Sequence, residues 1–343
     1  MKIMNAVVYT KYGSPDVLQL KEVEKPIPRD DEILIKVHAA SINSWDWDML
    51  TGRPLEYRLL SGILKPTKTK ILGCDIAGRI EGVGRNLKQF NPGDDVFGDL
   101  CEGLWGGFAE YVCARESELT LKPAGMTFEE AAATPQAGLL ALQGLCDKRE
   151  IKPGQRILIN GAGGGVGTFA IQMAKSFGAE VTGVDSTGKL DTMRSLGADH
   201  VIDYTQENFT KNGKCYDLIL DVKTDRSIFD YRRALSSNGI YVTVGGKSAR
   251  ILQLVFVGSL ISMIGSKKLT LIMHNLLTKL NPKRICIHAL SALSGPIYTA
   301  NELFYAGIDP NEMRLNRVGC FDVGVQCGGW GHIDLELKME DRK

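Results

Sequence analysis

The 343-residue chain lacks most of the features that mark secreted, membrane or nucleic-acid-binding proteins. Its eight cysteines are scattered and include no C-x-x-C pair, so free, buried thiols of an intracellular protein are expected. The formal net charge of +1 gives no reason to expect a nucleic acid or a membrane as a partner. The sequence also contains no internal repeat and no low-complexity segment.

Long hydrophobic runs are absent as well. The start, MKIMNAVVYTKYG, has no apolar core of signal-peptide length, and we therefore expect a cytoplasmic protein. The longest apolar run, residues 251–264, falls short of the ~20 residues that cross a bilayer. It predicts a buried helix, or a helix that packs on a partner subunit.

The pattern that is present changes along the chain. The first part reads mainly as strands between Gly/Pro turns, for example residues 32–42 and 108–114. After Gly154, short apolar runs such as 156–160 and 180–185 alternate with helical segments. This alternation predicts an α/β protein with a parallel, doubly wound sheet.

A glycine-rich loop separates the run 156–160 from the helix that follows it. The loop reads Gly-Ala-Gly-Gly-Gly-Val-Gly over residues 161–167, and Asp185 ends the next apolar run. Gly164 would let the backbone approach a pyrophosphate, and Gly167 would let the helix pack tightly on the strand. Phe169, Met173 and Phe177 form one apolar stripe on that helix, which should end at Gly178. The context predicts a dinucleotide-binding site.

Further motifs carry a resemblance to a known family. They are Gly-Cys-Asp-Ile-Ala-Gly at 73–78 with Gly84, and the segments at 91–96, 107–112 and 131–135. With the glycine loop they cover about residues 5–270 in family order. The chain resembles the medium-chain dehydrogenase/reductase superfamily, in its zinc-free quinone oxidoreductase-like branch.

The resemblance implies a domain organisation. Residues 1–122 would form a partly open GroES-like β-barrel, the catalytic domain, and residues 123–265 a Rossmann dinucleotide-binding domain. Residues 266–343 would return to the catalytic domain, but after about Leu280 the sequence departs from the family pattern. The resemblance also allows a homodimer through the Rossmann domain.

Cofactor contacts follow from the loop and from the resemblance together. The residues assigned to the cofactor are Thr134, Gly161, Ala162, Gly164, Gly165, Val166, Gly167, Asp185, Ser186, Thr187, Lys189, Tyr204, Val222, Gly245 and Gly246. Lys189 and Tyr204 match residues that meet the 2′-phosphate in NADPH-using quinone oxidoreductases, whereas Asp185 favours a free ribose hydroxyl. NADPH is the favoured cofactor, and NADH stays open.

Zinc ligands are replaced at the positions where zinc-holding relatives carry them. Asn43 stands in place of a cysteine, Cys74 in place of a histidine, and the third position falls near residues 134–136. A catalytic zinc needs three protein ligands and an open position. We therefore expect no bound metal, and a small buried role for Cys74.

Without a Lewis acid, a conjugated acceptor is easier to reduce than a simple ketone. The predicted activity is NAD(P)H-dependent hydride transfer to a quinone or an α,β-unsaturated carbonyl, a small molecule. A zinc-free alcohol or aldehyde dehydrogenase and a non-catalytic nucleotide-binding protein remain alternatives. Candidate catalytic residues are Asn43, Asp46 and Tyr57. Asn43 and Asp46 equally fit a helix N-cap with an acidic third residue.

Overall fold

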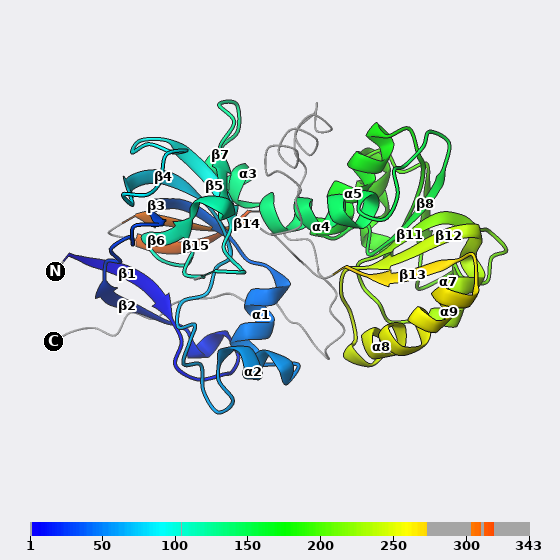
Figure 1. Cartoon of the computed structure of the whole chain (residues 1–343), viewed down its shortest axis with the longest axis horizontal. Helices are drawn as coiled ribbons and strands as arrows, with labels where there is room; N and C mark the ends of the chain where they lie inside the picture. Colours follow the sequence, from blue (N-terminus) through cyan, green and yellow to red (C-terminus); the bar gives the residue numbers. More distant parts are fainter. Residues whose placement is uncertain (1, 104, 273–302, 310–311, 319–343) are drawn as a thin grey trace. The chain divides into compact units, whose positions relative to one another are not determined.

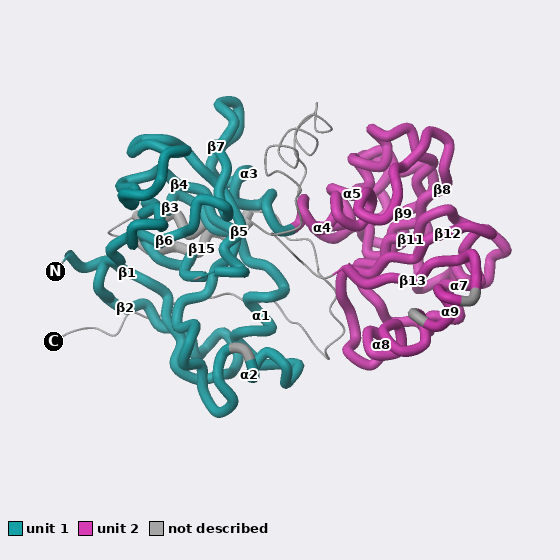
Figure 2. The backbone as a smooth tube through the Cα atoms, viewed as in Figure 1, with its two compact units in different colours: residues 1–136, 301–343 teal, residues 137–300 magenta. Residues whose placement is uncertain are grey.

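A computed structural model describes residues 2–103, 105–272, 303–309 and 312–318 of the chain. It divides into two compact units (Figure 2). Unit 1 contains the described residues before Ala137 and those after Ala300, and unit 2 begins at Ala137. The division falls later in the chain than the expected boundary at residue 122.

Unit 2 is built on a six-stranded parallel sheet (Figure 1). The strands are β8 (Arg156–Asn160), β9 (Glu180–Asp185), β10 (His200–Asp203), β11 (Tyr216–Asp221), β12 (Leu235–Thr243) and β13 (Lys268–Leu271). They lie in the order β10-β9-β8-β11-β12-β13, and each neighbouring pair is parallel. This is the doubly wound order 3-2-1-4-5-6, with its switch point between β8 and β11. The predicted Rossmann fold is confirmed.

Helices cover both faces of this sheet, as Figure 1 shows. On one face, α5 (Gly165–Ser176) buries Phe169 and Met173 in a cluster that also includes residues of α4 (Pro135–Cys146). Phe177 packs on the same cluster, and Gly178 follows with a φ of +77°, so the predicted stripe and the left-handed helix end are confirmed. On the other face, α7 (Ile228–Ala234) buries Tyr231 in a second cluster.

Unit 1 contains a five-stranded antiparallel sheet in the order β6-β3-β4-β5-β7. Its strands are β3 (Glu32–Ser41), β4 (Asp75–Val83), β5 (Asp95–Asp99), β6 (Tyr111–Arg115) and β7 (Leu119–Leu121). A second sheet pairs β1 (Ile3–Val8) with β2 (Gln19–Glu24), and a bridge joins Ala6 to Ala109. Ile33, Ile35 and Val37 alternate along β3 and point into one core, as a half-buried strand requires. The predicted partly open GroES-like barrel is confirmed.

Short helices connect the strands of unit 1. They are α1 (Ser44–Thr51), α2 (Glu56–Ser61) and α3 (Phe128–Ala132), with 3₁₀ turns at Pro15–Val17 and Glu116–Glu118. In unit 2 a 3₁₀ turn at Thr187–Lys189 leads into α6 (Leu190–Ser195). The described helices include none that is both long enough and apolar enough to cross a membrane.

The apolar run at 251–264 differs from its predicted burial. It forms the end of α8 (Ser248–Gln253), a π-helical turn η4 (Leu254–Gly258) and α9 (Ser259–Ile264). Phe256, Leu260 and Met263 are 73%, 56% and 83% exposed. The prediction of a buried helix is wrong, because in this segment it is mainly Leu254 and Gly258 that face the interior. Packing on a partner subunit stays a prediction.

The expected return of the chain after residue 266 lies partly outside the described residues, and so does the departure from the family pattern after residue 280. Within the described part, β14 (Leu303–Asp309) and β15 (Glu312–Val318) form an antiparallel pair. The two strands form a sheet of their own among the described residues.

Candidate active site

The glycine loop after β8 is fixed to the neighbouring strand β9. Gly161 has a φ of +83°, a left-handed conformation that favours glycine. The N–H groups of Gly161 and Ala162 both donate to the carbonyl oxygen of Val184, at 2.9 and 3.1 Å. The loop therefore opens at the carboxyl end of the parallel sheet, next to the switch point where α/β proteins bind ligands.

Gly164 and Gly167 have different spatial constraints. A Cβ on Gly167 would lie 2.3 Å from the carbonyl oxygen of Gly161 and 2.5 Å from the Cα of Ala162. No side chain fits there, because both obstacles are backbone atoms. A Cβ on Gly164 would meet only the Gly161 oxygen, at 3.4 Å, so this side of the loop is open. Gly164 is also the N-cap of α5, whose first turn offers unpaired N–H groups to an anion.

Asp185, at the end of β9, points toward the glycine loop. Its Oδ2 accepts a hydrogen bond from the N–H of Gly163 at 2.9 Å, and its Oδ1 accepts one from the N–H of Ser186 at 2.8 Å. The Nζ of Lys189 lies 3.9 Å from Oδ1, and both residues are about nine-tenths buried. The carboxylate is therefore held by the loop and partly neutralised by the lysine.

The neighbouring predicted cofactor residues gather around the same strand end. The Thr187 hydroxyl donates to the carboxylate of Asp203, which ends β10. The N–H of Tyr204 donates to the carbonyl oxygen of Asp185 at 3.2 Å, and the Tyr204 side chain is 41% exposed. The structure thus brings Asp185, Thr187 and Tyr204 together. Sequence reasoning missed Asp203, although an acid at the end of an apolar run was a visible signal.

A buried carboxylate that sequence reasoning also missed lies across the switch point. Asp221 is fully buried at the end of β11, and accepts hydrogen bonds from Asn160 Nδ2 and Tyr241 Oη, both at 2.7 Å. Burial raises the pKa of Asp221, and these hydrogen bonds oppose the shift. Asn160 and Asp221 are far apart in sequence, so only the folded sheet reveals the pair. It ties β8 to β11 where the glycine loop begins.

Three other predicted cofactor positions lie near this end of the sheet. Val222 follows Asp221, and its Cβ would be 3.3 Å from a Cβ on Gly161. Gly246 has a φ of +135°, and the carbonyl oxygen of Gly245 accepts from the N–H of Thr224 at 3.2 Å. Thr134 belongs to unit 1, where its hydroxyl donates to the carbonyl oxygen of Glu130 at 2.8 Å.

In unit 1, Asn43 and Asp46 form the start of helix α1. Asn43 is the N-cap, and its N–H donates to Asp46 Oδ2 at 2.8 Å. The other carboxylate oxygen, Oδ1, accepts from the N–H of Gly73 at 2.8 Å. Burial raises the pKa of Asp46 to about 7, against the effect of these two hydrogen bonds. Asp46 therefore closes the first turn of α1, as the N-cap alternative predicts, and it also joins α1 to the Gly73 turn. Its catalytic role stays a prediction.

The three positions that hold zinc in other relatives converge beside Asp46. Asn43, Cys74, Asp75 and Gln136 are all buried, and the N–H of Gln136 donates to Asp75 Oδ2 at 3.1 Å. Asn43 Nδ2, Asp75 Oδ1 and Gln136 Nε2 have no hydrogen-bond partner of normal geometry among the described residues. Asn43 nevertheless lies close enough to Asp75 to lower its pKa. This effect is smaller than that of burial and of Asp99, which raise it.

These residues do not fit a zinc ion. Amides are weak zinc ligands, and Asn43 and Gln136 place two of them where a catalytic zinc needs three protein ligands. Burial raises the pKa of the Cys74 thiol well above its ordinary value. In the described part of the chain, no three His, Cys, Asp or Glu side chains are grouped to hold a metal ion. What the cluster offers instead is two amide donors beside a buried carboxyl group.

The remaining candidate, Tyr57, belongs to a neighbouring aromatic cluster. It packs with Trp45, Leu72 and Cys74, and it is hydrogen-bonded to Asp48. Burial raises the pKa of Tyr57 above its ordinary value, and the nearby Asp48 carboxylate adds to the shift. Tyr57 is therefore a neutral hydroxyl whose catalytic role stays a prediction.

Two family descriptions match the chain. Residues 29–124 match the family described as "Alcohol dehydrogenase GroES-like domain", and residues 165–275 match the one described as "Zinc-binding dehydrogenase". Together they cover the antiparallel sheet of unit 1 and the strands β9 to β13 of the parallel sheet of unit 2.

Individual relatives point to one group of reductases. The chain is 33% identical over 257 residues to the chloroplast envelope quinone oxidoreductase homolog of Arabidopsis thaliana, covering 71% of this chain and 75% of that protein. It is 37% identical to the chloroplastic NADPH-dependent alkenal/one oxidoreductase of the same plant, covering 64% of this chain and 57% of the relative. The structure of the quinone oxidoreductase from Coxiella burnetii superposes with a TM-score of 0.74 at 29% identity, covering 85% of this chain and 89% of that one. Several curated relatives are longer, and the match spans only 56 to 60% of their length.

Proposed function

Because the chain belongs to the medium-chain dehydrogenase/reductase superfamily, among its quinone oxidoreductase-like members, we propose that it is an NAD(P)H-dependent reductase of quinones or α,β-unsaturated carbonyls. Unit 2 is the dinucleotide-binding domain in this proposal, and unit 1 is the catalytic domain. The observation that carries it is the filling of the zinc-ligand positions by Asn43 and Gln136, in a chain whose glycine loop is complete.

The amide pair accounts for the preference for a conjugated acceptor. A bound nicotinamide cofactor would supply the hydride. Among the described residues, the buried Gln136 Nε2 has no hydrogen-bond partner, and Asn43 Nδ2 interacts with Asp75 only outside normal hydrogen-bond geometry. Both donors suit an oxygen that gains negative charge. Hydride addition to a quinone or an enone spreads that charge over a conjugated system, so hydrogen bonds can replace a metal. Asp46 positions Asn43, and Tyr57 remains a candidate proton donor.

A substrate panel tests the proposed activity. Oxidation of NADPH is followed with quinones and enones on one side, and with simple aldehydes, ketones and alcohols on the other. We expect turnover with the conjugated acceptors only. Turnover confined to simple aldehydes or alcohols would show that the chain is an alcohol or aldehyde dehydrogenase. Binding of NADPH without turnover of any acceptor would favour a non-catalytic nucleotide-binding protein.

NADPH is the cofactor that we propose. Lys189 lies beside the end of β9 with its ammonium near the carboxylate of Asp185, and Tyr204 is exposed at the same place. A lysine in this position can form a charge-assisted hydrogen bond with a 2′-phosphate. The alkenal/one oxidoreductase relative is named as NADPH-dependent, which supports the same choice.

The absence of zinc from the working enzyme is also part of the proposal. It rests on the amide side chains of Asn43 and Gln136, which are weak zinc ligands. Elemental analysis of the purified protein should find much less than one zinc per chain. About one zinc per chain, lost together with activity on chelation, would contradict it.

We further propose a homodimer through unit 2. Phe256, Leu260 and Met263 are exposed on η4 and α9, which pack beside strand β13 at the edge of the sheet. Large exposed apolar side chains in one segment are typical of an interface. Light scattering should give the mass of a dimer for the wild type and of a monomer for Phe256→Glu. The matched control is Phe229→Glu on α7, also exposed, which should leave the dimer intact.

For the location of the protein we propose the cytoplasm. The five described cysteines are all free thiols, which is typical of a reducing compartment. Relatives occur in chloroplasts and mitochondria, so imaging of the tagged full-length protein is the deciding measurement.

A further inference from the structure

A hollow lies in unit 2, at the end of the sheet opposite the glycine loop. It has a volume of about 160 Å³ and is lined by Arg156, Glu180, Thr182, His200, Lys214, Cys215 and Tyr216. Four of these begin strands: Arg156 β8, Glu180 β9, His200 β10 and Tyr216 β11. A five-residue strand spans roughly 15 Å, so this hollow is separate from the cofactor loop at the carboxyl ends.

The parallel register brings the lining residues together. Arg156 pairs with Glu180 between β8 and β9, and His200 pairs with Thr182 between β10 and β9. Amino ends of parallel strands meet at one edge, so residues distant in sequence line one hollow. The site is therefore a product of the fold, and no local sequence motif marks it.

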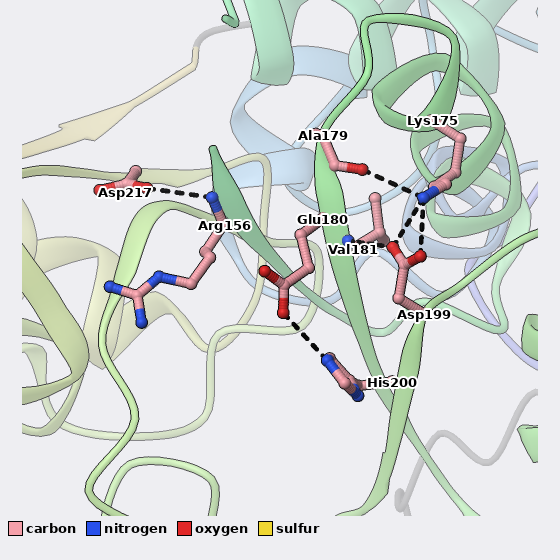
Figure 3. A network of polar contacts seen from close by, with 8 residues as sticks. All are labelled: Arg156, Lys175, Ala179, Glu180, Val181, Asp199, His200 and Asp217. Carbon is pink, nitrogen blue, oxygen red and sulfur yellow. Dashed lines mark hydrogen bonds and ion pairs between the residues drawn. The ribbon is translucent and has the colours of Figure 1, made fainter. Parts of the chain in front are cut away.

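Positive groups outnumber negative groups in the lining. The side chains of Arg156 and Lys214 form no ion pair among the described residues. The one acid, Glu180, accepts a hydrogen bond from His200 Nε2 at 2.9 Å, which engages one of its oxygens (Figure 3). Asp217 lies outside the lining, and its oxygens accept hydrogen bonds from the Arg156 N–H at 3.0 Å and the Ser236 hydroxyl at 2.8 Å. Two cations thus face the hollow without a counter-charge of their own.

The buried hydroxyl of Tyr216 is a further polar group of the lining, and the Thr182 and Asn212 side chains interact with it only outside normal hydrogen-bond geometry. Tyr216 is 2% exposed, and its Oη has no hydrogen-bond partner of normal geometry among the described residues. Burial raises the pKa of this hydroxyl, an effect that the nearby Thr182 and Asn212 side chains only partly oppose. The group is therefore a neutral donor. A ligand oxygen would give this hydroxyl an acceptor of normal geometry.

We propose that this hollow is a binding site for a phosphate group. The planar guanidinium of Arg156 would donate hydrogen bonds to two phosphate oxygens. The Lys214 ammonium would add a positive charge, and the Tyr216 hydroxyl would donate a further hydrogen bond. The volume holds a phosphate with a few further atoms, so free phosphate and a small phosphate monoester are both suitable. Nothing in the proposed reductase reaction uses this site, and the two proposals stand independently.

The thiol of Cys215 provides a local test, because it lines the hollow. Alkylation of Cys215 by iodoacetamide is followed by mass spectrometry, with and without inorganic phosphate or glycerol 3-phosphate, at constant ionic strength. We expect phosphate to slow the labelling of Cys215 at least threefold and to leave the labelling of Cys146 unchanged. The probe that protects Cys215 at the lower concentration shows whether free phosphate or a monoester is preferred.

Variants of the lining residues test whether the protection of Cys215 depends on the proposed contacts. Lys214→Met and Tyr216→Phe should each raise the phosphate concentration needed for half protection by about tenfold or more. Lys211→Met, an exposed lysine three positions earlier, removes the same charge and should have no effect. The assignment would be overturned if phosphate protected Lys214→Met as well as it protects the wild type. It would also be overturned if acetate protected the wild type as well as phosphate does. The absence of any protection of Cys215, which is measured on the folded wild-type protein, would overturn it as well.

Discussion

At the scale of single residues, Asp185 and Lys189 decide the choice of cofactor. The Asp185 carboxylate is held by the N–H groups of Gly163 and Ser186, so it cannot turn outward without losing two hydrogen bonds. The Lys189 ammonium lies 3.9 Å from this carboxylate and offsets its charge, and we propose that it also binds the 2′-phosphate of NADPH. NADPH binding should depend on Lys189 more than NADH binding does.

The corresponding variant is Lys189→Ala, measured with both cofactors. NADPH affinity should fall by about 1.5–3 kcal/mol, the range for a hydrogen bond to a charged group, while NADH affinity changes little. Fluorescence titration gives both dissociation constants, and Lys148→Ala on the surface is the matched control. A wild type that strongly prefers NADH, or a variant that binds NADPH as well as before, would show that Asp185 sets the preference.

Asn43 allows a second residue-scale prediction. Its N-cap contact uses its backbone N–H, which Asn43→Ala keeps, while the variant removes the side-chain amide that lies beside Asp75. If the amide stabilises the developing oxyanion, kcat with a quinone should fall about 100-fold, with the KM for NADPH unchanged. Exposed Asn86→Ala is the control. A change in kcat of less than threefold would leave Asn43 as a helix cap alone.

At the scale of the elements, sequence patterns were sufficient to predict the bounds of strands that are buried along nearly their whole length. Strands β8 and β9 have the predicted bounds, because each has a buried centre between polar ends, Arg156 and Asn160 in β8 and Glu180 and Asp185 in β9. Burial of the run at 251–264 could not be predicted in this way, since an apolar helix can face either a core or a surface. The pairs Asn160–Asp221 and Thr187–Asp203 were hidden for another reason. Their members meet only when the parallel strands have paired.

The contact between α5 and the glycine loop makes an element-scale prediction. In Gly167→Val the new side chain would meet the carbonyl oxygen of Gly161 at 2.3 Å, so the helix must move away from the loop. We expect a loss of more than about 2 kcal/mol in the free energy of unfolding, and no measurable NADPH binding. Gly82→Val on β4 is the matched control, because a Cβ there meets nothing within 4 Å. Normal NADPH affinity in a folded Gly167→Val protein would refute the role given to this glycine.

At the scale of the whole molecule, both units bury carboxyl groups that have no ion pair with any lysine or arginine in the described part of the chain. Burial raises the pKa of Asp46 and Asp75 in unit 1 and of Asp221 in unit 2. Their oxygens accept hydrogen bonds from backbone or side-chain donors, which hold β4 to α4 and β8 to β11. An acid whose pKa is higher in the folded than in the unfolded chain makes folding take up a proton. Stability must therefore fall as the pH rises through the interval between the two pKa values.

Asp46 gives this effect a measurable window. Its pKa is about 7 in the fold and 3.8 in a free side chain, so the destabilisation begins near pH 4 and is complete above pH 7. Asp46→Asn cannot ionise, and it loses one of the two acceptor oxygens, a constant cost at every pH. The stability advantage of the wild type over Asp46→Asn should therefore shrink as the pH rises, by up to about 4 kcal/mol over the full window. Urea unfolding at pH 4, 5, 6, 7 and 8 measures the difference, with Asp16→Asn, an exposed acid, as the control. A difference that stays constant with pH would show that Asp46 is ionised throughout, held as a carboxylate by the N–H groups of Asn43 and Gly73. In that case Asp46 would be a fixed negative charge beside Asn43 and would have no proton to give near neutral pH.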